Sequence, residues 1–144
     1  MFNSILVICT GNICRSPIGE RVLQNMFPDK KVDSAGTSAL VGKPADYSAG
    51  IIAKKYGLSL DGHLGKQFTP SLGRRYDLIL VMEKNHLEFI GMLAPEIRGK
   101  TMLLGHWLEQ KEIPDPYGKS EEAFDYVFNL IAESCRLWES KISR

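Results

Sequence analysis

A cysteine, an arginine and an aspartate have the residue types and spacing that could carry out a group-transfer reaction. Cys9 and Arg15 stand at the two ends of the segment CTGNICR, and Asp115 lies far downstream between two prolines. A cysteine thiolate is a strong nucleophile, an arginine fork binds two phosphate oxygens, and a carboxyl group can protonate a leaving group. These residues predict attack of sulfur on a phosphomonoester, with a cysteinyl-phosphate intermediate.

The segment that begins at Cys9 lies between an expected strand and an expected helix. Ser4–Cys9 is continuously apolar after its first residue, which predicts a buried strand, and Ser16 and Pro17 predict the N-cap and first residue of a helix. A loop that curls there directs its backbone N–H groups into one concavity, at the positive end of the helix dipole. We expect this field to favour the thiolate of Cys9. The residues expected to bind phosphate are Thr10, Gly11, Asn12, Ile13, Cys14 and Ser16.

Asp115 lies in the segment IPDPY, where two prolines stiffen the loop. The loop follows the last expected strand, so it should open on the same edge of the sheet as the phosphate-binding loop. We therefore predict that Asp115 is the general acid. Tyr117, two residues later, is expected to form an aromatic wall for the substrate ring.

Four apolar strands alternate with helices along the chain. After Ser4–Cys9, strands are expected at residues 31–35, 76–82 and 101–104. Helices are expected from Ser16 to residue 27, from an Asp46 cap to Gly57, over residues 84–93, and from Glu121 to the C-terminal end. The last helix carries apolar residues at spacings of three and four. This alternation predicts an α/β fold with a parallel sheet covered on both faces, which binds ligands at the carboxyl ends of the strands.

Composition excludes several functional classes. The 144 residues fit one domain, residues 1–144, and a net charge of +1 gives no reason to expect nucleic-acid binding. The apolar runs are too short for membrane insertion, and we find no signal peptide. Three cysteines form no disulfide framework and suit a reducing compartment, so we expect a cytoplasmic protein. The histidines have no zinc-ligand spacing, so no metal is expected.

The segment from Cys9 to Pro17, together with Asp115-Pro-Tyr117, resembles the low-molecular-weight protein tyrosine phosphatase family. The resemblance covers nearly the whole chain. It implies a flavodoxin-like three-layer fold with a four-stranded parallel sheet and helices on both faces, and it implies no cofactor. It also implies that Cys9 is the nucleophile, that Arg15 binds the phosphate and that Asp115 acts first as acid and then as base. In the family pattern, Asn12 and Ser16 brace the loop and tune the thiolate.

Three further segments resemble the enterobacterial members of this family that act in exopolysaccharide or capsule production. They are Ser34-Ala-Gly36, Leu40-Val-Gly-Lys43 and residues 95–107. The resemblance implies a monomer whose partner is a membrane tyrosine kinase with a phosphorylated, tyrosine-rich tail. Eukaryotic members carry an aromatic residue near the position of Leu40 and often a second tyrosine where this chain has Gly118. We therefore expect Leu40 to line a less aromatic pocket mouth.

Two other functions and one redox role stay open on the residues alone. A thiol-dependent arsenate reductase shares this fold and loop but needs relay cysteines, whereas Cys135 lies on the apolar face of the last helix. A non-catalytic phosphate-binding module would keep the loop and could lose the nucleophile or acid. Cys14 either pairs reversibly with Cys9, as the family resemblance implies, or is a small residue packed beneath the loop.

Overall fold

The computed structural model describes residues 2–143; Met1 and Arg144 lie outside the described residues. Four parallel strands form one sheet in the order β2-β1-β3-β4. The strands are β1 (Ser4–Cys9), β2 (Lys31–Gly36), β3 (Leu78–Val81) and β4 (Thr101–Leu103). The predicted α/β architecture and parallel sheet are confirmed, although β3 is shorter than expected because residues 76, 77 and 82 lie outside the ladder.

The register of the sheet brings the carboxyl ends of its strands to one edge. Cys9 at the end of β1 pairs with Gly36 at the end of β2, and Val81 at the end of β3 pairs with both Ile8 and Leu103. The loops that follow all four strands therefore start at the same edge. This edge is where open α/β sheets bind their ligands.

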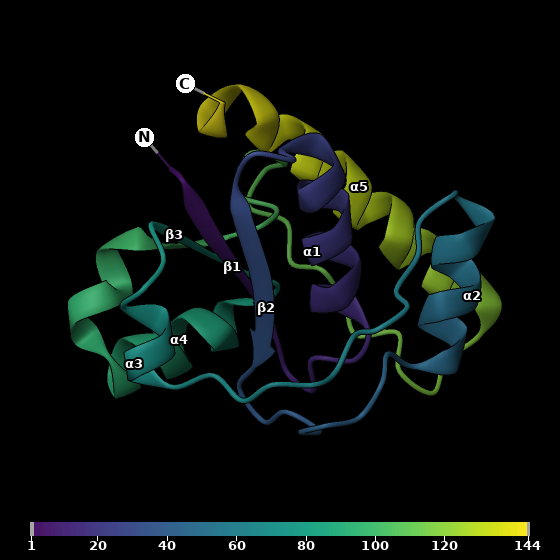
Figure 1. Cartoon of the computed structure of the whole chain (residues 1–144), viewed down its shortest axis with the longest axis horizontal. Helices are drawn as coiled ribbons and strands as arrows, with labels where there is room; N and C mark the ends of the chain where they lie inside the picture. Colours follow the sequence, from purple (N-terminus) through teal and green to yellow (C-terminus); the bar gives the residue numbers. More distant parts are fainter. Residues whose placement is uncertain (1, 144) are drawn as a thin grey trace.

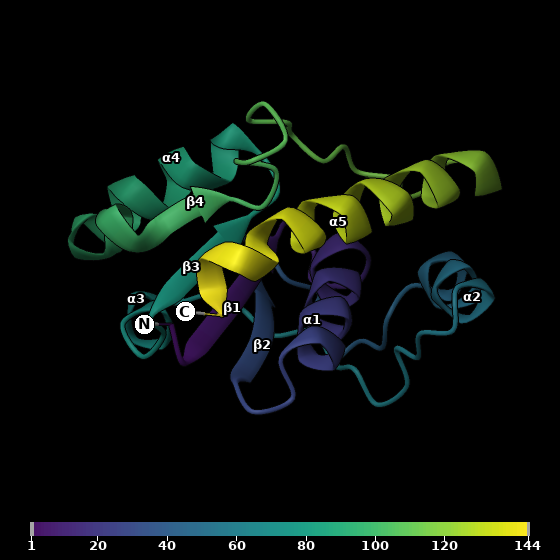
Figure 2. The ribbon, with the colours of Figure 1, turned by 90° about the horizontal axis from the view of Figure 1, so that it is seen from above.

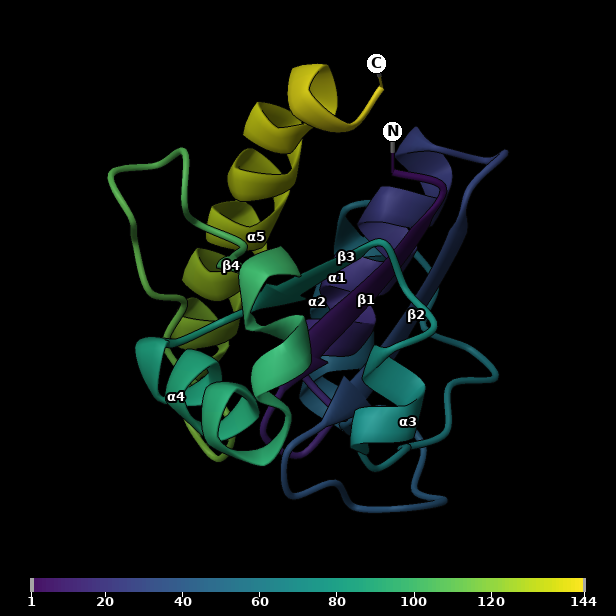
Figure 3. The ribbon, with the colours of Figure 1, turned by 90° about the vertical axis from the view of Figure 1, so that its left-hand side faces the viewer.

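Helices cover both faces of the sheet, as Figures 1 and 2 show. On one side lie α1 (Arg15–Met26) and the long α5 (Glu121–Ile142), with α2 (Tyr47–Lys55) packed against the N-terminal half of α5. On the other side lie α3 (Pro70–Gly73), α4 (Lys84–Leu93) and the short 3₁₀ helix η1 (Pro95–Lys100), which face the viewer in Figure 3. With respect to membranes, no helix within residues 2–143 is both long and apolar enough to span a bilayer.

Alternation along β1 builds a separate core on each face of the sheet. Ile5 and Val7 pack with residues of α1, α2 and α5, whereas Leu6 and Ile8 pack with residues of α3, α4 and η1. All four are fully buried, as expected for a strand covered on both faces. The apolar residues predicted for the last helix are also buried: Phe124, Val127, Phe128, Ile131, Cys135, Trp138 and Ile142.

Two details differ from the sequence-based expectations, and a third is confirmed. The first helix begins at Arg15, so Ser16 is not its N-cap; the side chain of Ser16 bonds to Cys9 and Asn12 instead. The helical spacing predicts that Ala49, Ile52, Ala53 and Tyr56 point inward, but Tyr56 is 43% exposed, because it follows α2 and stacks on Phe128 at the surface. The predicted Asp46 cap of α2 is confirmed, since its carboxylate accepts hydrogen bonds from the backbone N–H groups of Ser48 and Ala49.

Candidate active site

The loop from Cys9 to Arg15 has its carbonyl groups turned outward. The carbonyl oxygens of residues 9, 10 and 11 accept hydrogen bonds of 3.0 Å from the backbone N–H groups of Thr37, Ser38 and Leu40, respectively. The next two carbonyls accept from His63 Nε2 at 2.6 Å and from the Asp46 N–H at 2.8 Å. Five successive carbonyls are therefore bound by segments that wrap the outside of the loop.

With its carbonyls bound outside, the loop presents its backbone N–H groups toward its centre. Within residues 2–143, the N–H groups of Gly11, Asn12, Ile13 and Cys14 donate to no other protein group. Asn12 makes this curl possible by adopting a φ of 59°, in the left-handed region that asparagine tolerates. The loop leads directly into the N-terminus of α1, whose dipole adds positive potential. This arrangement suits a tetrahedral anion such as phosphate.

The Cys9 sulfur lies at the end of a chain of hydrogen-bond donors. Asn12 Nδ2 donates to Ser16 Oγ at 2.7 Å, which leaves the Ser16 hydroxyl proton free to point at Cys9 Sγ, 2.9 Å away. Asn12 and Ser16 are fully buried. A directed hydroxyl in a buried setting stabilises a sulfur anion more than a neutral thiol.

The same asparagine is fixed from behind by residues of three other segments. Its Nδ2 also donates to Ser34 Oγ at 3.0 Å, and its Oδ1 accepts from the backbone N–H of Lys66 at 2.8 Å. The Ser34 hydroxyl donates a hydrogen bond of 2.6 Å to the Glu20 carboxylate. His63 contacts both the Glu20 carboxylate and the Asn12 carbonyl. All polar atoms of the Asn12 side chain thus have partners, which holds the loop in one conformation.

Both terminal nitrogens of Arg15 have protein partners at the pocket. Its Nη1 pairs with Glu83 and donates to the carbonyl of Ile113 at 2.8 Å. Its Nη2 lies 3.4 Å from Thr10 Oγ1 and 3.9 Å from Asp115 Oδ2. Because Thr10 and Asp115 both line the pocket, Nη2 is the nitrogen directed toward a bound anion. The guanidinium is buried, so its pairing with Glu83 is protected from solvent screening.

His86 connects Glu83 to Thr10. Its Nδ1 accepts from the backbone N–H of Glu83 at 3.1 Å, so Nε2 carries the proton and donates to Thr10 Oγ1 at 2.9 Å. Burial, followed by the positive charge of Arg15, lowers the pKa of His86 to about 4. The imidazole is therefore neutral near pH 7, and this protonation state matches its two hydrogen bonds.

Asp115 and Tyr117 also line the pocket, from the proline-bounded loop before α5. The Asp115 side chain is about half exposed, and its Oδ1 accepts a hydrogen bond of 3.0 Å from the backbone N–H of Tyr117. The bond closes a short turn that directs Oδ2 toward Arg15. A half-exposed carboxyl group at the pocket rim can exchange protons with a bound substrate and with water.

A cavity of about 340 Å³ brings together most of the residues predicted from sequence. Its lining residues are Cys9, Thr10, Gly11, Ile13, Cys14, Arg15, Ser38, Leu40, Asp115 and Tyr117. Asn12 and Ser16 do not line it, because both residues are fully buried. Ser38 was not anticipated, nor were Glu83 and His86 as partners of Arg15 and Thr10. The position of Glu83 in the sequence could have indicated its role, because it follows β3 at the carboxyl edge of the sheet.

The two remaining cysteines are buried thiols. Cys14 lines the pocket but is 4% exposed, and burial, followed by the nearby Asp46 carboxylate and Cys9, raises its pKa. Cys135 is fully buried in α5, where burial raises its pKa to about 12. Both therefore favour the neutral thiol near pH 7.

A parallel α/β sheet that carries a cysteine, an arginine and a ring of amides after its first strand defines a phosphate-handling enzyme. Residues 4–144 match the family model described as low molecular weight phosphotyrosine protein phosphatase. The chain belongs to this family, as the motifs around Cys9 and Asp115 predicted.

Individual relatives are similar over nearly their whole length. The low molecular weight protein-tyrosine-phosphatase Etp of Escherichia coli K12 is 54% identical over 143 residues, which cover 99% of this chain and 97% of Etp. The crystal structure of the tyrosine phosphatase Wzb from E. coli K30 in complex with sulphate is 60% identical, with a TM-score of 0.97 and 99% of both chains covered. Vibrio vulnificus Wzb in complex with benzylphosphonate is 53% identical, with a TM-score of 0.95 and coverage of 98% and 99%.

Proposed function

We propose that this protein hydrolyses phosphotyrosine through a phosphorylated cysteine. The observation that carries the proposal is the inward-facing ring of amides at residues 11–14, with the Cys9 sulfur, bonded by Ser16, at its edge. An aryl phosphate matches this site, because its dianion fits the ring and its aromatic group fits the cavity beside Leu40 and Tyr117. Benzylphosphonate, the ligand in the Vibrio vulnificus Wzb structure, likewise joins a phosphonate group to an aromatic ring.

In the first step, the Cys9 thiolate attacks phosphorus and the bond to the phenolic oxygen breaks. The loop amides and Arg15 Nη2 stabilise the charge on the three equatorial phosphate oxygens. Asp115 gives its proton to the departing phenolate, so tyrosine leaves as a neutral phenol. The pairing of Arg15 Nη1 with Glu83 and Ile113 keeps the guanidinium oriented while Nη2 binds the phosphate.

In the second step, water attacks the cysteinyl phosphate. Asp115, now ionised, accepts a proton from that water, and the sulfur–phosphorus bond breaks to release inorganic phosphate and the Cys9 thiolate. The Ser16 hydroxyl, 2.9 Å from Sγ, stabilises the thiolate as it leaves. The cycle consumes one water molecule for each phosphate released.

Substitution of the nucleophile tests the proposed function. We expect the parent protein to hydrolyse p-nitrophenyl phosphate and a phosphotyrosine peptide, and Cys9→Ser to hydrolyse neither while it still binds inorganic phosphate. Cys135→Ala is the matched control, because Cys135 is buried in α5 outside the pocket. The proposal fails if folded Cys9→Ser retains activity, or if the parent protein releases no phosphate from either substrate.

We further propose that the physiological substrate is the phosphorylated tyrosine-rich tail of a membrane tyrosine kinase that controls exopolysaccharide or capsule synthesis. Support comes from the resemblance of residues 34–36, 40–43 and 95–107 to enterobacterial members with this role. The protein would act as a monomer in the cytoplasm, where reducing conditions keep a nucleophilic thiol active. Cys9→Ser protein immobilised on a column should retain the phosphorylated kinase from lysate, and retention of only unrelated phosphoproteins would refute this assignment.

A further inference from the structure

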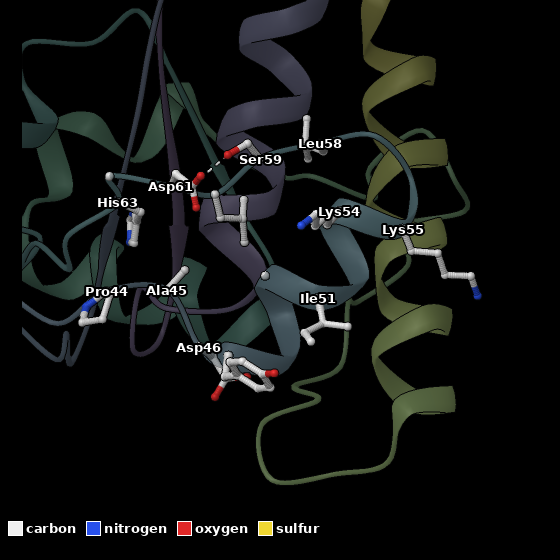
Figure 4. Close-up of a pocket in the computed structure, with 14 residues that line it drawn as sticks. Pro44, Ala45, Asp46, Ile51, Lys54, Lys55, Leu58, Ser59, Asp61 and His63 are labelled. Carbon is white, nitrogen blue, oxygen red and sulfur yellow. Dashed lines mark hydrogen bonds between the residues drawn. The ribbon is translucent and has the colours of Figure 1, made fainter.

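A second concavity lies beside the catalytic loop and takes no part in the proposed chemistry. This α2 groove has a volume of about 860 Å³ and is bounded by three segments: residues 44–47, the outer face of α2, and residues 58–63. Figure 4 shows Lys54 directed from α2 toward the segment that holds Ser59 and Asp61, while Lys55, which also lines the groove, extends toward α5. Lys55 forms a salt bridge there with Asp125 of α5.

One face of α2 is turned to the groove and contributes little to the core. Tyr47 and Ile51, four residues apart on the same helix face, are 82% and 49% exposed. The opposite face carries Ala49, Ile52 and Ala53, which are buried. Two large apolar side chains are thus held at the groove by a helix that packs through other residues.

Gly50 lies between Tyr47 and Ile51 and also lines the groove. No turn requires a glycine there, because the residue lies inside α2 and its φ is not positive. Packing does not require it either, since an added Cβ would meet no atom within 4 Å. A glycine inside a helix is less stable than an alanine. What this glycine provides is open space between two exposed apolar side chains.

The α2 groove and the catalytic pocket share a wall. Leu40 lines the pocket, and residues 44–47 of the same segment line the groove. The Asp46 N–H bonds to the carbonyl of Ile13, which lines the pocket, and the Asp46 carboxylate is close enough to raise the pKa of Cys14. A polypeptide whose phosphotyrosine occupies the pocket therefore has its neighbouring residues at the border of the groove.

We propose that the α2 groove binds the substrate polypeptide on one side of the phosphotyrosine and receives an apolar side chain over Gly50. This inference rests on the proposed phosphotyrosine phosphatase function. The groove carries charges of both signs, at Lys54, Asp46 and Asp61, so apolar contact with Tyr47 and Ile51 supplies the selectivity. The site would distinguish among phosphotyrosine sequences, whereas the catalytic pocket recognises the phosphotyrosine itself.

A series of peptides that differ only in the position of one leucine tests this proposal. Each peptide has a phosphotyrosine in a glycine–serine background, with one leucine placed at successive positions before or after it. We expect kcat/KM to rise about tenfold when leucine stands at one or two positions on a single side, since burial of one leucine is worth about this factor. The result would appear as a lower KM, with kcat little changed.

Gly50→Leu fills the groove without altering the catalytic residues. We expect it to remove the leucine preference while hydrolysis of p-nitrophenyl phosphate and of the leucine-free peptide stays at the parent level. Ser140→Leu, at an exposed position near the end of α5, is the matched control and should keep the preference. Leucine is a better helix former than glycine, so folding of Gly50→Leu is not at risk.

The proposal is overturned if no leucine position raises kcat/KM in the parent, or if folded Gly50→Leu keeps the preference. It is also overturned if Gly50→Leu abolishes a concentration-dependent dimer seen by analytical ultracentrifugation while no peptide preference exists, because the groove would then bind a second copy. If the parent protein itself does not hydrolyse p-nitrophenyl phosphate, the proposed function is refuted instead.

Discussion

Acid should destabilise the fold through His86. The side chain is 2% exposed, and burial is the largest cause that lowers its pKa from 6.5 to about 4, followed by Arg15. The other charged groups that face it are Glu83, Asp115 and Glu112, which oppose the shift. Because the folded-state pKa lies below the unfolded-state value, the unfolded chain binds a proton first as the pH falls. Stability from the neutral imidazole is complete above pH 6.5 and is lost toward pH 4.

The size of the effect follows from the two pKa values. The folded-state pKa is about 4 and the unfolded-state pKa is 6.5. The free energy of unfolding should therefore fall by about 2 kcal/mol when the pH is lowered from 7 to 5. The loss reaches about 3 kcal/mol at pH 4. Protonation would also place a second cation beside Arg15 and remove the acceptor that bonds the Glu83 N–H.

Urea denaturation of the parent and of His86→Asn, at a series of pH values from 7 to 4, measures this contribution. Asparagine keeps a short acceptor for the Glu83 N–H but does not titrate, so the acid-dependent loss should be smaller in the variant by about 2 kcal/mol at pH 5. Other groups titrate equally in both proteins and cancel in the comparison. Parallel stability curves for the two proteins would show that His86 is not held neutral by the fold.

Three further substitutions have defined outcomes. Asp115→Asn should lower kcat for phosphotyrosine about 100-fold or more while phosphate affinity is kept, because only the proton donor is lost; an unchanged kcat with this poor leaving group would exclude Asp115 as the acid. Ser16→Ala should slow iodoacetamide alkylation of Cys9 at mildly acidic pH, since the hydroxyl that stabilises the thiolate is gone; an unchanged alkylation profile would contradict that role. Gly36→Ala should reduce both activity and stability, the latter by about 2 kcal/mol, because its Cβ would lie 2.3 Å from the Thr10 carbonyl oxygen. Gly50→Ala is its control, and urea denaturation with a p-nitrophenyl phosphate assay would reject the argument if the two variants behaved alike.

The sequence was informative where the site is continuous in the chain. Cys9 to Arg15 could be placed between a strand and a helix because an apolar run, turn residues and Ser-Pro follow one another directly. Asp115 could be assigned to the same edge because its loop follows the last strand. Even here the detail was wrong for Ser16, since the helix begins two residues earlier than predicted. The Ser16 hydroxyl bonds to Cys9 and does not cap α1.

Partners brought in from other segments could not be predicted. Glu83 and His86 reach Arg15 and Thr10 from the start of α4. His63 bonds to the Asn12 carbonyl, and Glu20 is linked to Asn12 through Ser34 and His63. Periodicity indicates which face of a helix is buried, but it does not indicate which polar groups meet across elements. The α2 groove was missed for a related reason, because Gly50 reads as an ordinary helix-weakening residue until its surroundings are known.

Direct observation of a phosphorylated Cys9 tests the central claim most directly. Parent protein mixed with p-nitrophenyl phosphate, quenched rapidly and digested for mass spectrometry should yield a phosphoryl group on the peptide that contains Cys9. In Asp115→Asn, which lacks the base for the hydrolytic step, this species should persist longer. Turnover with no phosphorylated Cys9 at any quench time, or with the phosphoryl group on another residue, would contradict the account.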